Sequence, residues 1–261
     1  MPEARSRMLS RHDLKVLLRS RSLAFMRDRD AERYVPGATA SLRVRGRTVH
    51  YRPGSSDLEV IYKILLKGGR KAEYFVPESA APGVIWDVGA NIGAASLYFA
   101  ERFPAARIHC FEPVQSNFAV LEKNVAEAPG IRAHRVALGA GSGELEISAS
   151  ANARNFGGFS FLYDGAAAVP VERVPMRTPQ DMIAAGVPAP DFIKIDVEGA
   201  EYDILTAFPP ELLARVRWLV GELHSKRSFA LLEYLTQWFD IETRKSLGKP
   251  LFAFSARNKS S

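Results

Sequence analysis

From Val84 onward the sequence alternates between short apolar runs and longer stretches with helical spacing, and this alternation limits the fold more than any other feature. Short apolar runs bounded by Gly or Pro are typical of buried strands. Strands that alternate with helices predict a mostly parallel, doubly wound sheet with helices on both faces. The expected strands cover residues 84–88, 107–111, 131–138, 191–196 and 216–223, and the expected helices cover residues 92–103, 114–126, 200–208 and 229–239.

The remaining segments extend this core on both sides. Residues 1–80 have little apolar core of their own, so we interpret them as an extension or cap of helix, hairpin (40–51) and helix (57–66), with the main domain in 81–261. Strands are also expected at 144–148, 169–174, 241–244 and 251–255. The intervening segment 151–165 is rich in Asn, Gly and Ala, and we expect it to close over an acceptor, with Asn155 and Ser160 as polar contacts.

The composition indicates the kind of protein and where it is expected to be found. Hydrophobic residues make up 47% of the chain, which is enough for a sizeable core, and the net charge of +6 is modest. The basic N-terminal stretch is better explained as a solvated helix face than as a nucleic-acid site. One cysteine, Cys110, and the lack of a secretory signal or a membrane-length apolar stretch predict a cytoplasmic protein without a membrane span. Either a monomer or a homodimer fits the sequence.

The first strand of the alternating region ends in a glycine-containing turn, Asp87-Val88-Gly89-Ala90-Asn91-Ile92-Gly93. Glycines let the backbone turn sharply and approach a ligand, and the helix that follows offers free N–H groups. The second strand ends in Phe111-Glu112-Pro113, where a carboxylate can accept hydrogen bonds from both hydroxyls of a ribose. The two strand ends therefore predict a site for an adenosine-type cofactor.

The spacing of the glycines separates the cofactor classes. Gly89 and Gly93 lie four residues apart with no glycine between them, which is a poor match to the dinucleotide pattern, and the Gly-Lys-Ser/Thr of a phosphate-binding loop is absent from the sequence. The acidic Asp87 would repel phosphate, but it suits a ligand that carries an amino group and a sulfonium. This favours S-adenosylmethionine.

Four strings of residues together resemble the FkbM family of methyltransferases. They are residues 86–93, residues 111–113 with Asn117, residues 194–201 and residues 222–224, and the resemblance covers about residues 55–255. It implies a Rossmann-like class I methyltransferase with a mostly parallel, seven-stranded sheet whose last strand is antiparallel. It also implies O-methylation of hydroxyls on natural products, sugars or glycans, so that the partner is a small-molecule or saccharide acceptor.

Motif and resemblance together give a set of expected cofactor contacts. The end of the third strand is expected beside the adenine by resemblance, and Asp196 is expected near the methionyl end, because parallel strands end on one rim. The expected cofactor-binding residues are Asp87, Gly89, Ala90, Asn91, Gly93, Glu112, Pro113, Asn117, Ala137, Leu138 and Asp196.

The acceptor side of the same rim carries the expected catalytic residues. Transfer to a hydroxyl gains from a nearby base, and His224 is the first candidate because its ordinary pKa lies near neutral pH, with Asp196 or Glu198 as alternatives. Glu198 and Glu201 could instead stabilise the start of the next helix. A divalent metal held by Asp196, Glu198, Glu222 and His224 is another option, although the sequence pattern favours a metal-free site.

Two further functions stay open on the sequence. An N-methyltransferase for an amine or nucleic acid has only the basic N-terminus in its favour, and the segment after the fourth strand reads Asp196-Val-Glu-Gly where an Asp/Asn-Pro-Pro-aromatic string is typical of adenine methylation. A catalytically inactive cofactor-binding module is the other alternative, which the intact acidic and glycine positions disfavour.

Overall fold

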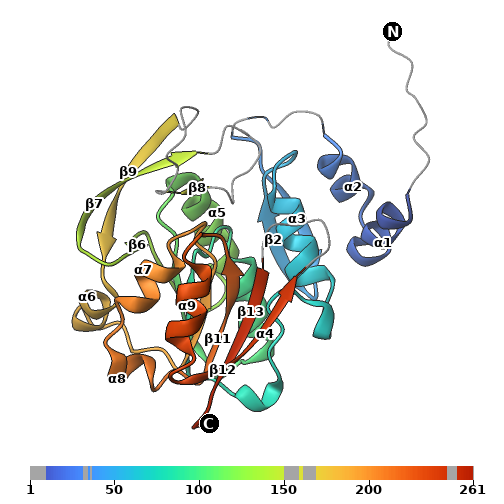
Figure 1. Cartoon of the computed structure of the whole chain (residues 1–261). Coiled ribbons are helices and arrows are strands. Elements are labelled where there is room, and N and C mark those ends of the chain that lie inside the picture. The colour runs from blue at the N-terminus through green and yellow to red at the C-terminus, as the bar shows by residue number, and fades with distance from the viewer. Residues whose placement is uncertain are drawn as a thin grey trace.

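A seven-stranded sheet forms the centre of the protein (Figure 1). The computed structural model describes residues 10–31, 35, 37–149, 159–160, 169–245 and 252–260. The sheet order is β12-β13-β11-β10-β3-β4-β5, and β13 is antiparallel to both of its neighbours while the other pairs are parallel. The predicted class I, Rossmann-like architecture is therefore confirmed. The strands are β3 (Val84–Val88), β4 (Arg107–Phe111), β5 (Ile131–His134), β10 (Phe192–Ile195), β11 (Trp218–Leu223), β12 (Phe239–Lys245) and β13 (Phe252–Asn258).

Helices cover both faces of this sheet because its central strands are apolar on both sides. In β3, Ile85 joins one core cluster, whereas Trp86 and Val88 join the other. The first face is covered by α4 (Ala94–Arg102) and α5 (Gln115–Val125). The second is covered by α6 (Pro179–Ala184), α7 (Glu201–Thr206), α8 (Pro210–Leu213) and α9 (Ser228–Leu235). Figure 1 shows α7 and α9 lying over the strands of the second face.

The expected third strand, residues 131–138, is wrong as a single element. Only β5 joins the main sheet, and β6 (Ala137–Leu138) pairs in parallel with β9 (Val169–Arg177) in a second sheet. That second sheet has the order β6-β9-β7-β8, where β7 is Gly143–Ala149 and β8 is Phe159–Ser160. Apart from β8, the expected acceptor-covering segment 151–165, with Asn155, lies outside the described residues.

Short helices were missed by the sequence analysis. The α6 helix begins with a capping box between Thr178 and Asp181 and has a proline in its first turn, so its signal is present in the sequence. The α8 helix spans four residues, too few to show a helical period.

The described part of the N-terminal segment consists of two helices, a β-hairpin and a further helix, and it packs on the first face. Its apolar side chains share one core with α4 and α5. The π-helical turn η1 that continues α3 contacts α4, and β2 contacts α5. The elements are α1 (Arg11–Ser20), α2 (Leu23–Arg29), β1 (Ala40–Val44), β2 (Arg47–Tyr51), α3 (Asp57–Ile61), η1 (Tyr62–Leu66), η2 (Gly69–Lys71) and η3 (Glu78–Ala80).

In the described part of the chain, no helix combines the length and the apolar character needed to cross a bilayer.

Candidate active site

A cavity of about 260 Å³ opens at the carboxyl ends of β3, β4 and β10. It lies where the chain order reverses between β3 and β10, which is the usual ligand position in an open parallel sheet. Besides Asp196, eight expected cofactor contacts line it, and they are Gly89, Ala90, Asn91, Glu112, Pro113, Asn117, Ala137 and Leu138. Asp196 and Glu198 line the same cavity, so it joins the expected cofactor and acceptor ends.

The turn after β3 brings its backbone close to the end of β10. Gly89 has a φ of 76°, and a Cβ on it would lie 1.9 Å from the backbone oxygen of Asp196, so no side chain fits there. Asn91 also adopts a left-handed conformation, and its buried Oδ1 has no hydrogen-bond partner among the described residues. A buried polar atom of this kind needs a partner, which a bound ligand would provide.

Gly93 has another role than the one expected from the motif. It has a φ of 84°, and a Cβ on it would lie 2.6 Å from Leu121 Cδ1 on α5. It does not line the cavity. Gly93 therefore permits close packing of the turn against α5.

Asp87 likewise does not line the cavity. Its side chain is fully buried, and Oδ1 lies 3.0 Å from Lys194 Nζ on β10. Oδ2 accepts a hydrogen bond of 2.6 Å from the Ser96 hydroxyl. Lys194 in turn donates to the backbone oxygen of Gly89 at 2.7 Å. Asp87 thus supports the glycine turn through Lys194, a residue whose role the sequence analysis did not identify.

Glu112 is held in a fixed orientation at the cavity wall. Its side chain accepts hydrogen bonds from the backbone N–H groups of Asn91 (2.8 Å) and Val114 (3.0 Å), and from Asn117 Nδ2 (3.3 Å). Burial raises the pKa of Glu112 above its ordinary value, although these hydrogen bonds oppose the change. Oε1 already accepts two of these hydrogen bonds, whereas Oε2 accepts one and keeps a lone pair for a ribose hydroxyl.

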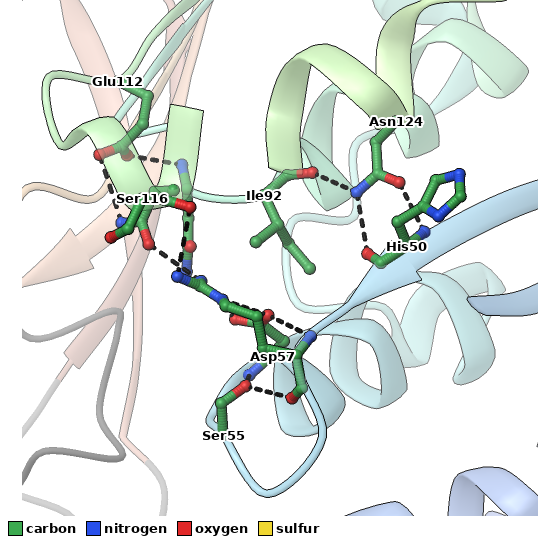
Figure 2. A network of polar contacts seen from close by, with 10 residues as sticks. His50, Ser55, Asp57, Ile92, Glu112, Ser116 and Asn124 are labelled. Atoms are coloured by element: carbon green, nitrogen blue, oxygen red, sulfur yellow. Dashed lines mark hydrogen bonds and ion pairs between the residues drawn. The ribbon is translucent and has the colours of Figure 1, made fainter. Parts of the chain in front are cut away.

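A buried network connects this carboxylate to the N-terminal segment (Figure 2). Arg52 donates to Asn117 Oδ1 at 2.9 Å and to the two oxygens of Asp57 at 2.7 and 2.8 Å. Two turns further along α5, Asn124 donates to the backbone oxygen of Ile92 at 2.7 Å and accepts from the His50 N–H at 2.6 Å. Both links were missed, because they join residues far apart in the sequence.

The acceptor side gathers carboxylates around one imidazole. His224 Nε2 lies 3.6 Å from Asp196 Oδ1, 3.8 Å from Glu198 Oε2 and 3.5 Å from Glu222 Oε2. Its Nδ1 lies 2.8 Å from Glu201 Oε1. We call these five residues the acidic cluster. The structure therefore brings together His224 and the four carboxylates expected beside it on this rim.

Electrostatics changes the expected role of His224. Burial disfavours its charged form, but hydrogen bonds to Glu201 and Glu222 outweigh burial and raise the pKa of His224 to about 11. The ring is therefore a cation at neutral pH and is unsuited to accept a proton there. Burial raises the pKa of Glu198 to about 7, in the range expected of a general base. For Asp196, burial is outweighed by Lys194 and His224, which hold the pKa of its carboxyl below the ordinary value.

The N-terminal segment supplies a wall of the cavity near the acidic cluster. Glu59, Lys63, Glu73 and Tyr74 line it. Lys63 Nζ lies 3.2 Å from Glu59 and 3.7 Å from Glu73, and the Tyr74 hydroxyl donates to Asp196 Oδ2 at 2.7 Å. Helical periodicity predicted a helix over residues 57–66, which includes Glu59 and Lys63 but not Glu73 or Tyr74, and no pattern marked these four residues as part of a site.

Fold and cavity together define a class of protein, the Rossmann-like class I methyltransferases, with an acidic residue at the end of the second main strand and a glycine turn after the first. The model of the methyltransferase FkbM domain matches residues 87–248, and the chain belongs to this family.

Several curated proteins are similar over a little more than half of the chain. AMB antimetabolite synthetase AmbE of Pseudomonas aeruginosa is 31% identical over 56% of the chain and 9% of its own length. Hexuronic acid methyltransferase AglP of Haloferax volcanii is 29% identical over 57% of the chain and 59% of its own length. The 31-O-demethyl-FK506 methyltransferase FkbM of Streptomyces tacrolimicus is 28% identical, over 55% and 66% respectively. In each case the match spans less than two thirds of the relative.

Proposed function

We propose that this protein transfers the methyl group of S-adenosylmethionine to a hydroxyl oxygen of a small molecule, natural product or saccharide. The observation that carries the proposal is that one cavity is lined both by the glycine turn and Glu112 and by three carboxylates of the acidic cluster, Asp196, Glu198 and Glu222. Two relatives support the acceptor class, since their names describe a hexuronic acid and a 31-O-demethyl compound as what they methylate.

The residues present fit the cofactor. Glu112 would accept hydrogen bonds from the ribose hydroxyls, Ala137 and Leu138 would lie beside the adenine, and the unpartnered Oδ1 of Asn91 would accept from a donor group of the ligand. The bound cofactor supplies a methyl carbon activated by its sulfonium. The protein then has to align an acceptor with it and remove a proton.

The acidic cluster would perform the proton transfer. As the acceptor oxygen bonds to the methyl carbon, the carbon–sulfur bond breaks and its electron pair stays on sulfur, so that S-adenosylhomocysteine leaves. The hydroxyl proton passes to a carboxylate of the cluster, and Glu198 is the first choice because its pKa of about 7 makes it a working base. Asp196 and the His224 cation would orient the hydroxyl.

A labelled methyl group tests this proposal. The protein would be incubated with S-adenosylmethionine carrying a ¹³C-methyl group and a panel of methyl glycosides, macrolide alcohols and matching amines. We expect ¹³C-methyl ether signals in the NMR spectrum of at least one hydroxyl acceptor, and their loss with Glu198→Gln. Label found only on nitrogen would contradict the assignment.

A further inference from the structure

Within the described ranges, Asp196, Glu198 and His224 each offer one ligand atom, and these three atoms lie within 4.8 Å of one another. Two carboxylates and an imidazole are a common ligand set for divalent transition-metal ions. The three residues come from the ends of β10 and β11, so the sheet itself sets their spacing.

The orientation of His224 is the second observation. The residue is well buried, with 6% of its side chain exposed, and its Nδ1 is engaged by Glu201 at 2.8 Å. Glu201 is itself fixed, because its Oε1 also accepts from the Gly199 N–H at 3.1 Å. A carboxylate that holds one ring nitrogen and points the other at the site is the usual support of a metal-bound histidine.

The other ring nitrogen, Nε2, faces Asp196 and Glu198 at distances beyond a hydrogen bond, and Glu222 at the outer limit of one. Its separations from Asp196, Glu198 and Glu222 are 3.6, 3.8 and 3.5 Å, longer than ordinary N–H···O contacts. Atoms bound to one ion at about 2.1 Å lie about 3 Å apart at right angles and about 4 Å apart when opposite. The observed separations fall within that range.

The charges of the acidic cluster also favour binding of a cation. Four carboxylates surround the imidazole, and the buried Lys194 beside them is paired with Asp87 at 3.0 Å. Glu201 is buried and the other three carboxylates are 20–34% exposed, and partly shielded carboxylates that outnumber their positive partners favour binding of a cation.

We propose that Asp196, Glu198 and His224 hold a divalent transition-metal ion of the Mn²⁺ type beside the acceptor. The mixed nitrogen and oxygen ligands favour such an ion over Ca²⁺, which prefers oxygen alone. This inference rests on the proposed function and refines it. An ion there would displace the proton from His224 Nε2 and acidify the acceptor hydroxyl. With Glu198 bound to the ion, Glu222, outside the three-ligand set, would take the hydroxyl proton in place of Glu198.

Mn²⁺ itself is the probe. The full chain would be stripped with a chelator, freed of the chelator and titrated with Mn²⁺, and the EPR signal of free Mn²⁺ would be followed. We expect one ion per chain with a dissociation constant of about 10⁻⁶ to 10⁻⁴ M. Glu198→Gln and His224→Asn should each weaken binding at least about tenfold.

Glu73→Gln is the matched control, since it removes one negative charge from the same cavity outside the ligand set. It should change the Mn²⁺ dissociation constant by less than about twofold, because diffuse charge effects are small beside direct coordination. Equal weakening by Glu73→Gln and Glu198→Gln would overturn the site, as would the lack of stoichiometric binding by the unchanged protein.

Calorimetry with S-adenosylhomocysteine on the same samples checks folding and separates the two proposals. Cofactor binding without Mn²⁺ binding would refute the metal site and leave the methyltransferase proposal standing. Mn²⁺ binding without cofactor binding would refute the methyltransferase proposal and leave the metal site standing.

Discussion

At the scale of single residues, the environment decides what each side chain can do. His224 and Glu198 are neighbours, yet the hydrogen bonds of His224 to Glu201 and Glu222 raise its pKa to about 11, while burial raises the pKa of Glu198 to about 7. Residue type alone favoured His224 as the base. The contacts reverse that order, because the base must be unprotonated at the working pH.

In the protein stripped of metal ions, the pH dependence of methyl transfer follows from Glu198. Because its pKa is raised to about 7, the carboxylate is protonated below that pH, and kcat/KM should rise as pH increases through about 7. Glu198→Gln should lower kcat at least about a hundredfold and remove this limb of the profile. The exposed Glu146→Gln on β7 serves as control. An unchanged limb in Glu198→Gln would assign the titration to another group.

Gly89 gives a second prediction at this scale. Alanine there would meet the backbone oxygen of Asp196, so Gly89→Ala should abolish S-adenosylhomocysteine binding or destabilise the fold by several kcal/mol. Gly141→Ala is the matched control, since an added Cβ there has nothing within 4 Å. Calorimetry and urea unfolding of both variants provide the comparison, and similar behaviour of the two would refute the steric argument.

At the scale of elements, the buried contacts of Arg52 join the hairpin and α3 to α5. Arg52→Ala would leave Asp57 buried without its charge partner, which typically costs about 3–5 kcal/mol. It would also release Asn117, and so weaken cofactor binding at Glu112. Urea unfolding should show the loss, whereas the exposed Arg43→Ala on β1 should change the unfolding free energy by less than about 0.5 kcal/mol.

The interaction energy between Arg52 and Asp57 can be isolated with a double-mutant cycle. Arg52→Ala combined with Asp57→Ala should cost less than the sum of the single changes, because the second change removes the uncompensated charge. Additive costs would show that the pair does not couple the elements.

The elements themselves were largely predictable from the sequence. The strands at 84–88 and 107–111 match the expected bounds, because a parallel strand buried on both faces reads as an unbroken apolar run. The contact between Arg52 and Asn117 was not predictable, since it joins residues 65 positions apart and no local sequence pattern indicates it. For the same reason Asp87 was expected at the ligand, whereas the fold pairs it with Lys194.

At the scale of the whole molecule, the N-terminal segment and the sheet share one core. Phe25 of α2 is fully buried and packs against Tyr51 at a ring distance of 5.4 Å, whereas the three tryptophans, Trp86, Trp218 and Trp238, all lie beyond residue 80. Trp fluorescence therefore monitors the main domain, including Trp218, which packs against the shared core.

A substitution in α2 tests this shared core. Phe25→Ala should shift the urea-unfolding transition seen by Trp fluorescence by about 3–5 kcal/mol, and Leu23→Ala, whose side chain is 76% exposed, should not shift it. If Phe25→Ala leaves the unfolding transition seen by Trp fluorescence unchanged, the N-terminal segment folds separately.

The central claim is that the cavity beside Glu112 binds the adenosyl cofactor, and calorimetry tests it most directly. S-adenosylmethionine and S-adenosylhomocysteine should bind with dissociation constants of about 1–100 µM, and Glu112→Ala should weaken both by about 1–3 kcal/mol. Glu122→Ala, on the exposed face of α5, should leave both unchanged. Failure of the unchanged protein to bind either compound, or binding of NAD in their place, would contradict the account.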